Sequence, residues 1–204
     1  AVLAESLPLL PVHMTAPNYA CTAFTATAAD GEVRMGRNYD FKLDTSALLV
    51  RCAPKNGYKS IGLAALNNVK ADDPNESVSK KLACLTAPFI CLDGINEKGV
   101  SIAVLTLDSE PTYQDTGKQS IATTLAIRLV LDRAATTEEA VELLSSYDMF
   151  ATSGRDYHFY ITDASGDGRV VEWDPEVEGR PLKATPMRAI TNFYALYPDL
   201  VQPN

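Results

Sequence analysis

The chain is poor in several residues on which common functions depend. It has only two histidines, His13 and His158, and its four cysteines form neither a C-x-x-C pair nor a spacing typical of zinc sites. Lysine and arginine number 18 against 26 acidic residues and are scattered, so the basic patch of a nucleic-acid-binding protein is missing. No run of about 18 apolar residues is found. The sequence therefore gives no indication of a metal, a cofactor, nucleic-acid binding or a membrane span.

The composition is that of a soluble globular domain. Hydrophobic residues make up 46% and charged residues 22% of 204 residues, which is enough for one domain with its own core. The start, Ala1–Pro11, is apolar but contains Glu5 and has no basic beginning. It is therefore not an intact signal peptide, although it is compatible with the remnant of one. Cytoplasmic and secreted locations both stay open.

The pattern of apolar residues predicts a mixture of strands and helices. We expect strands at 47–52 (in the core), 99–107, 157–163 and 169–173, a strand or a buried segment at 58–67, a helix at 119–134 and an exposed loop at 70–81. Thr136 and Glu139 form a capping box, which predicts the start of a second helix. The two consecutive helices are expected to form one outer layer of an α+β domain.

Cys21 to Asp40 is the most informative segment. Small, β-branched and aromatic residues follow Cys21, the turn signal 29–31 comes next, and a second strand is expected from Val33. A hairpin of this kind brings Cys21 close to Arg37 and Asp40. A thiol beside a guanidinium and a carboxylate is a candidate nucleophile, because the cation favours the thiolate. The alternative is that Cys21 is an ordinary buried cysteine.

The other three cysteines carry no such signal. Cys52 lies in an expected strand, and Cys84 and Cys91 lie in the apolar stretch 82–92. Buried free thiols are the favoured interpretation, and a disulfide among them is left open.

Four segments in register resemble the choloylglycine hydrolase group of N-terminal nucleophile hydrolases, which contains bile salt hydrolases and penicillin V acylases. The segments are C-T at 21–22 with D-G at 30–31 and G-R-N-Y-D at 36–40, D-G-I-N-E-K-G-V at 93–100, Y-H-F-Y-I-T-D-A-S-G at 157–166 and I-T-N at 190–192. The resemblance runs from Cys21 to Tyr194. It implies an α-β-β-α sandwich that hydrolyses a linear amide C–N bond without a cofactor or metal.

The resemblance also implies a role for each site residue. Cys21 would be the nucleophile and its own α-amino group the base, with Asp40 holding that amine. Arg37 would favour the thiolate, and Asn192 and the backbone N–H of Thr106 would bind the oxyanion. The substrate would be a bile salt, an N-acyl amide or a penicillin V-type molecule. Thr106 stands where bile salt hydrolases tend to have Asn and penicillin V acylases Tyr, so the resemblance does not choose between them.

Two features depart from the group. Residues 1–20 precede Cys21 as a leader or propeptide, so a free amine requires self-cleavage of the Ala20–Cys21 bond, and the printed chain would be an inactive precursor. The chain also ends soon after Asn192, so the domain, 21–204, is expected to lack its C-terminal portion.

Two other interpretations stay open. One is a catalytically silent binding module of the same fold, which would never be cut. The other is a Cys21–His158 thiol hydrolase, although His158 lies between aromatic residues in an expected strand and has no evident acidic partner. A homo-oligomer is compatible with either interpretation.

Overall fold

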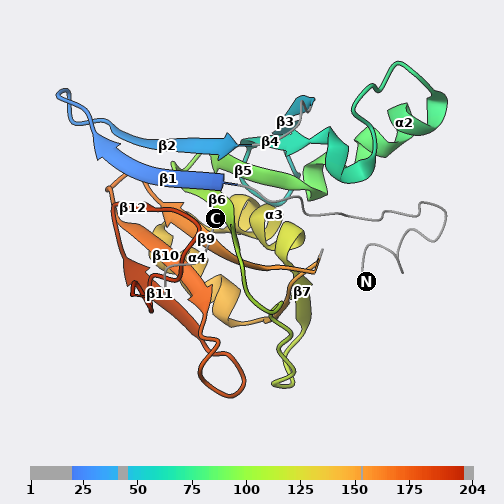
Figure 1. Ribbon diagram of the computed structural model, residues 1–204. Helices are drawn as coiled ribbons and strands as arrows, with labels where there is room; N and C mark the ends of the chain where they lie inside the picture. The colour runs from blue at the N-terminus through green and yellow to red at the C-terminus, as the bar shows by residue number, and fades with distance from the viewer. Residues whose placement is uncertain (1–19, 41–45, 153, 200–204) are drawn as a thin grey trace.

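Two β-sheets lie face to face, and helices cover the outer face of the larger sheet (Figure 1). The computed structural model describes residues 20–40, 46–152 and 154–199, so the expected leader and His13 lie outside the described residues. The smaller sheet consists of β1 (Ala20–Thr27), β2 (Val33–Asp40) and β12 (Ala189–Ile190), in the order β12-β1-β2.

The larger sheet has seven strands, which are β3 (Ala47–Cys52), β4 (Ser60–Ala65), β5 (Cys91–Asn96), β6 (Ser101–Leu107), β9 (Asp156–Thr162), β10 (Gly168–Trp173) and β11 (Leu182–Pro186). Their order is β11-β10-β9-β6-β5-β4-β3, with every neighbouring pair antiparallel. A separate parallel pair joins β7 (Ser120–Ala122) to β8 (Asp148–Phe150).

The helices α3 (Thr123–Arg133) and α4 (Thr137–Ser145) form one layer, as expected. Helix α3 packs on β5 and β6, and α4 packs on β9 and β10. The expected N-cap of α4 is confirmed, because the hydroxyl of Thr136 accepts the N–H of Glu139 at 3.1 Å. The return bond of the expected capping box is displaced by one residue, because the carboxylate of Glu139 accepts the N–H of Ala135 at 2.7 Å instead. The remaining helical segments are α2 (Val78–Ala83) and the 3₁₀ turns Leu66–Val69 and Cys84–Phe89. No helix of the described residues is long and apolar enough to cross a membrane.

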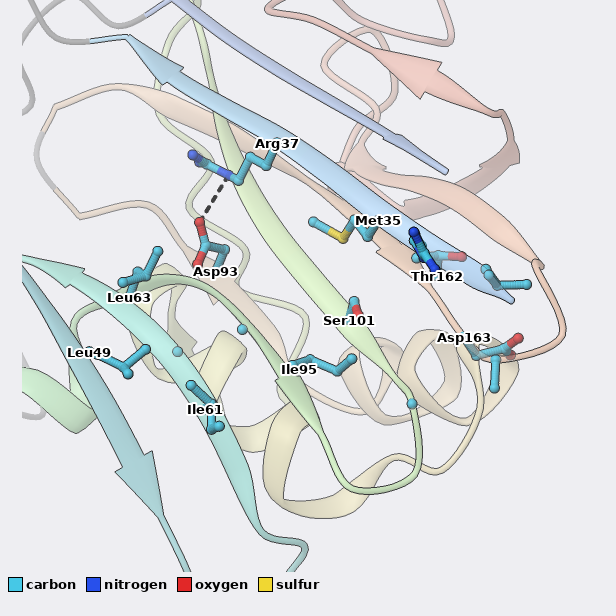
Figure 2. A pocket seen from close by; sticks show the side chains of 16 residues that line it. Met35, Arg37, Leu49, Ile61, Leu63, Asp93, Ile95, Ser101, Thr162 and Asp163 are labelled. Atoms are coloured by element: carbon cyan, nitrogen blue, oxygen red, sulfur yellow. Dashed lines mark ion pairs between the residues drawn. The ribbon is translucent and has the colours of Figure 1, made fainter. Parts of the chain in front are cut away.

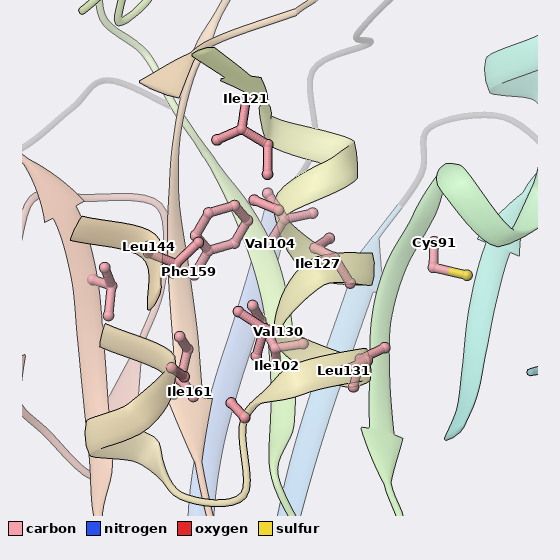
Figure 3. Close-up of a cluster of buried hydrophobic side chains, with 14 of the residues drawn as sticks. Cys91, Ile102, Val104, Ile121, Ile127, Val130, Leu131, Leu144, Phe159 and Ile161 are labelled. Carbon is pink, nitrogen blue, oxygen red and sulfur yellow. The ribbon is translucent and has the colours of Figure 1, made fainter. Parts of the chain in front are cut away.

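Strand β6 lies at the centre of the molecule and is buried on both faces. Ile102 and Val104 point into the core between the larger sheet and the helices, where they meet side chains such as Phe159 (Figure 3). Ala103 and Leu105 point the other way, into the core between the sheets. This double burial explains why four consecutive residues of β6, Ile102 to Leu105, are apolar rather than alternating with polar ones. The layers therefore run helices, larger sheet, smaller sheet, and the α+β class is confirmed.

Three expected elements differ from the structure. Segment 47–52 is an edge strand rather than a core strand, because Val50 alone is buried there and Leu49 is 65% exposed. Helix α2 begins inside the expected loop, with Ser77 accepting the N–H of Lys80. Helix α3 begins later than expected, because the residues before it pair with β8.

Candidate active site

Strand β1 directs the side chain of Cys21 into the space between the two sheets. Residues alternate along this strand, so Cys21, which is 3% exposed, shares the inner face with Ala23, while Phe24 is exposed. Across the hairpin, Cys21 lies opposite Tyr39 and Ala23 lies opposite Arg37. Opposite residues share a face, so the expected hairpin brings Cys21 and Arg37 to the same side of the sheet.

Arg37 is fixed by contacts on three sides, and its side chain is only 7% exposed. A terminal nitrogen donates a hydrogen bond to the carbonyl of Val104, and the guanidinium lies 4.5 Å from the ring centre of Tyr39. Its Nε lies 3.5 Å from Oδ2 of Asp93 on β5 (Figure 2). Burial raises the pKa of the Asp93 carboxyl, and the charge of Arg37 acts against this rise. The side chain of Arg37 therefore connects the two sheets beside the thiol.

Asn192 bridges the same two sheets with its side-chain amide. Its Oδ1 accepts the backbone N–H of Cys21 at 2.6 Å. Its Nδ2 donates to the carbonyl of Thr106 at 2.7 Å and lies 3.1 Å from the hydroxyl of that residue. Three residues that are far apart in sequence, Cys21, Thr106 and Asn192, thus meet at one point of the fold.

Several electrostatic effects act on the pKa of the Cys21 thiol in opposite directions. Burial is the largest and raises the pKa of the thiol above its ordinary value. The charge of Arg37 and hydrogen bonds from Asn192 and from the backbone of Thr106 lower it, and the Asp40 carboxylate raises it. Because burial prevails, the thiol needs a base to remove its proton at neutral pH.

Asp40 occupies a different position from the other expected site residues. It pairs with Ala20, one step beyond the Cys21–Tyr39 pair, and is exposed. Strand alternation places its side chain on the face away from Cys21, and its effect on the thiol is through charge. Asp40 therefore lies beside the Ala20–Cys21 bond rather than beside the sulfur.

His158 has an acidic partner that the sequence did not reveal. Its Nδ1 lies 3.4 Å from Oε2 of Glu172, and its Nε2 lies 3.1 Å from the carbonyl oxygen of Thr191. Both ring nitrogens are therefore engaged away from Cys21. This geometry does not support a Cys21–His158 dyad.

A groove of about 620 Å³ extends from Arg37 and Asp93 along the larger sheet (Figure 2). Apolar side chains from β3, β4 and β5 form part of its lining, and they are Leu49, Ile61, Leu63 and Ile95. No sequence motif indicated this groove, because its walls come from strands that are separated along the chain.

The arrangement around Cys21 suits attack on a carbonyl carbon. Two hydrogen-bonding groups, the side chain of Asn192 and the backbone of Thr106, act to lower the pKa of the Cys21 thiol. Donors held in place before the reaction stabilise the negative charge that develops on the carbonyl oxygen. All four cysteines are free thiols, and Cys21 alone has this combination of a nearby guanidinium and an Asn side chain among the cysteine environments described.

Comparison with known proteins gives a family match and a set of similar structures. Residues 21–179 match the family described as linear amide C–N hydrolases, choloylglycine hydrolase family. Two variants of the conjugated bile acid hydrolase from Clostridium perfringens match with TM-scores of 0.58 and 0.60, each at 20% identity, over 86% of this chain and 54% of theirs. The penicillin V acylase from Agrobacterium tumefaciens matches with a TM-score of 0.59 at 23% identity, over 85% of this chain and 52% of its own.

These matches show that the chain shares the fold of these two enzymes over most of its described length. The chain spans about half the length of the solved structures that it resembles. The family match begins at Cys21 itself, the residue around which the thiol site is built.

Proposed function

The chain belongs to the choloylglycine hydrolase family of linear amide C–N hydrolases, and from this premise we propose that Cys21 is the nucleophile of an amide hydrolysis. One observation carries the proposal: the side-chain amide of Asn192 binds both Cys21 and Thr106. Its Oδ1 accepts the N–H of Cys21, and its Nδ2 donates to the carbonyl of Thr106 on β6. The backbone N–H of Thr106 is the second proposed oxyanion donor. The substrate class is an N-acyl amide, with bile salts and penicillin V-type molecules among the candidates.

The first proposed step is cleavage of the Ala20–Cys21 bond. The sulfur attacks the carbonyl carbon of Ala20, the C–N bond breaks, and the nitrogen of Cys21 takes up a proton to become an amine. Water then hydrolyses the thioester between Ala20 and the sulfur, which releases the carboxylate of Ala20 and restores the thiol. Asn192 already holds this nitrogen at 2.6 Å, so the new amine remains beside the sulfur.

In the second step the new α-amino group acts as the general base. Its ordinary pKa of about 7.7 suits a base at neutral pH. It accepts the thiol proton, the thiolate attacks the substrate carbonyl, and Asn192 and Thr106 donate to the oxyanion. The amine of the substrate leaves with the proton held by the α-amino group. Water finally hydrolyses the acyl thioester, giving the free acid and the thiol.

Arg37 and Asp40 are proposed to assist from opposite sides of β2. Arg37 stabilises negative charge on the sulfur, and its ion pair with Asp93 keeps it in place. Asp40 lies opposite Ala20, so its negative charge is near the nitrogen of Cys21. Cleavage would convert this nitrogen to an α-amino group, and the carboxylate would stabilise the protonated form of that group.

Intact-mass measurement combined with a substrate panel tests this proposal. We expect the purified protein to begin at Cys21 and to hydrolyse at least one of conjugated bile salts, penicillin V, N-acyl amino acids and N-acylethanolamines. A chain that keeps the residues before Cys21 and hydrolyses none of these amides would instead indicate a binding module of the same fold.

His158→Gln separates the proposed mechanism from a thiol–imidazole dyad. We expect normal self-cleavage and a kcat reduced by less than about tenfold, because neither ring nitrogen contacts the sulfur. A dyad would lose about 10² to 10⁴-fold in kcat with its general base. Acetylation of the new N-terminus of the wild-type protein is the complementary measurement, and it should abolish activity. A protected N-terminus that leaves activity intact would contradict the amine as base.

A further inference from the structure

His158 and Glu172 form a buried pair that the proposed reaction does not use. They lie on the neighbouring strands β9 and β10, and both side chains are 0% exposed. Charged groups are rarely buried unless other groups compensate them, so each hydrogen bond of this pair has to be accounted for.

Their bonds hold the main chain on both sides of Asn192. Before it, Nε2 of His158 lies 3.1 Å from the carbonyl oxygen of Thr191. After it, the Glu172 carboxylate accepts the N–H of Ala195 at 3.0 Å and the N–H of Leu196 at 2.6 Å. The segment 191–196 is thus fixed to the larger sheet at its two ends, with Asn192 between.

The ring of His158 contacts one group with each nitrogen. Nε2 meets the carbonyl oxygen of Thr191, which only accepts hydrogen bonds. The other nitrogen, Nδ1, faces Oε2 of Glu172 at 3.4 Å. The two side chains therefore contact each other and segment 191–196 at the same time, so they hold this segment as one unit.

Other contacts in this segment and directly after it are of a different kind. The hydroxyl of Tyr194 donates to Asp156 at 2.8 Å, and the hydroxyl of Tyr197 donates to Asp174 at 2.6 Å. These bonds hold side chains, whereas Glu172 and His158 hold main-chain groups next to Asn192. The main-chain bonds are the ones that fix the direction in which the Asn192 side chain leaves the backbone.

We propose that Glu172, together with His158, is a positioning residue that sets the Asn192 side chain at the oxyanion site. The proposal rests on the proposed function of Asn192 as an oxyanion donor. Glu172 does not touch the reacting atoms and acts only through segment 191–196. A small displacement of a catalytic group lowers the rate strongly, because the donor must meet the oxyanion at hydrogen-bonding distance.

Glu172→Gln in the processed protein tests this role. A glutamine offers one carbonyl oxygen to the two N–H groups of Ala195 and Leu196, so at least one of them loses its acceptor. We expect kcat to fall by about tenfold with KM changed less than about threefold, as for a lost transition-state interaction. In an Asn192→Ala background the same substitution should change kcat by less than about twofold, because there is no side chain left to position.

Asp148→Asn is the matched control. Asp148 is also a buried carboxylate that accepts main-chain N–H groups, those of Thr116 and Lys118, but it holds the chain just before β7. Asp148→Asn should lower thermal stability while leaving kcat unchanged. An unchanged kcat in Glu172→Gln, or an equal fall of kcat in the Asn192→Ala background, would overturn the positioning role. Glu172→Asp, which keeps the charge but shortens the reach, supplies the same test if Glu172→Gln does not fold.

An NMR readout separates failure of this proposal from failure of the proposed function. The side-chain amide signals of Asn192, assigned by their loss in Asn192→Ala, should shift in Glu172→Gln and stay in place in Asp148→Asn. Exchange of the Ala195 and Leu196 amides with solvent should also accelerate. If the wild-type protein hydrolyses no amide while Glu172→Gln still shows these changes, the hydrolase proposal fails and the positioning role stands. Unmoved Asn192 signals would refute the positioning role.

Discussion

Cys21→Ala is expected to abolish self-cleavage and amide hydrolysis together. Both proposed steps use the same sulfur, so its removal should lower turnover by at least about 10⁴-fold and leave the Ala20–Cys21 bond intact. Cys21 contributes to the core between the sheets, but loss of one buried sulfur costs only about 1 kcal/mol of unfolding free energy. Intact mass, turnover and thermal melting of the same preparation measure all three effects.

Cys91→Ala is the matched control for this prediction. Cys91 is buried like Cys21, and burial raises the pKa of its thiol to about 12. Its thiol donates to the carbonyl of Ala87 and has no Asn side chain beside it. The Cys91 variant should therefore be cut and active. Retained turnover in Cys21→Ala would remove Cys21 as the nucleophile, and loss of turnover in both variants would point to damage of the fold instead.

The raised pKa of the Cys21 thiol explains why self-cleavage and catalysis are expected to be linked. In the described state, burial holds the pKa of the Cys21 thiol above its ordinary value even though Arg37 and two hydrogen-bonding groups act against it. A buried thiol of this kind stays protonated unless a base lies within reach. The Cys21 N–H donates its hydrogen bond to the side chain of Asn192, which is an amide and not a base. Cleavage at Ala20 would create the base at that nitrogen.

The sequence predicts the parts of the site that depend on local patterns. The hairpin of β1 and β2 could be predicted because the turn at 29–31 and the strand-forming residues around it are contiguous, and Gly31 has the positive φ, +88°, that the turn requires. Once the hairpin is given, the alternation of side chains places Arg37 with Cys21. The capping box at Thr136 is another local signal, and it gave the start of α4 correctly.

The partners of the site residues depend on long-range packing and were missed. Asp93 meets Arg37 because β5 lies opposite the smaller sheet, and Glu172 meets His158 because β9 and β10 are neighbours. The sequence around a carboxylate in an expected strand does not predict which cation or imidazole it will contact, because that partner lies far away in the sequence. The one available signal was the burial implied by the strand itself, since a buried acidic residue requires a partner.

The expected hairpin predicts which residues lie near each other along the strands, but Asp40 shows that the face on which a side chain lies also depends on the exact register. Its position at the end of the hairpin near Cys21 was correct, but Asp40 pairs with Ala20 rather than with Cys21. A shift of one residue along a strand moves a side chain to the opposite face. The carboxylate therefore lies beside the Ala20–Cys21 bond, and its proposed role is with the nitrogen rather than with the sulfur.

Asn192→Ala is expected to lower kcat by about 10² to 10³-fold, with a much smaller change in KM. The side-chain amide is one of two N–H donors proposed for the oxyanion, and loss of one such donor has this magnitude. The backbone N–H of Thr106 remains, so the effect should be smaller than that of Cys21→Ala. Loss of Oδ1 also frees the nitrogen of Cys21, so self-cleavage should slow, and kcat should be measured on fully processed protein.

Asn96→Ala distinguishes this catalytic effect from the loss of a buried amide in general. Asn96 is 4% exposed, and its side chain donates to the carbonyls of Leu131 and Ala134 and accepts the N–H groups of Lys98 and Val100. Its removal should therefore lower the melting temperature at least as much as Asn192→Ala while kcat of the folded protein stays the same. If Asn192→Ala instead behaves like Asn96→Ala, with lower stability and normal kcat, Asn192 is a structural bridge between the sheets and the oxyanion must be bound elsewhere.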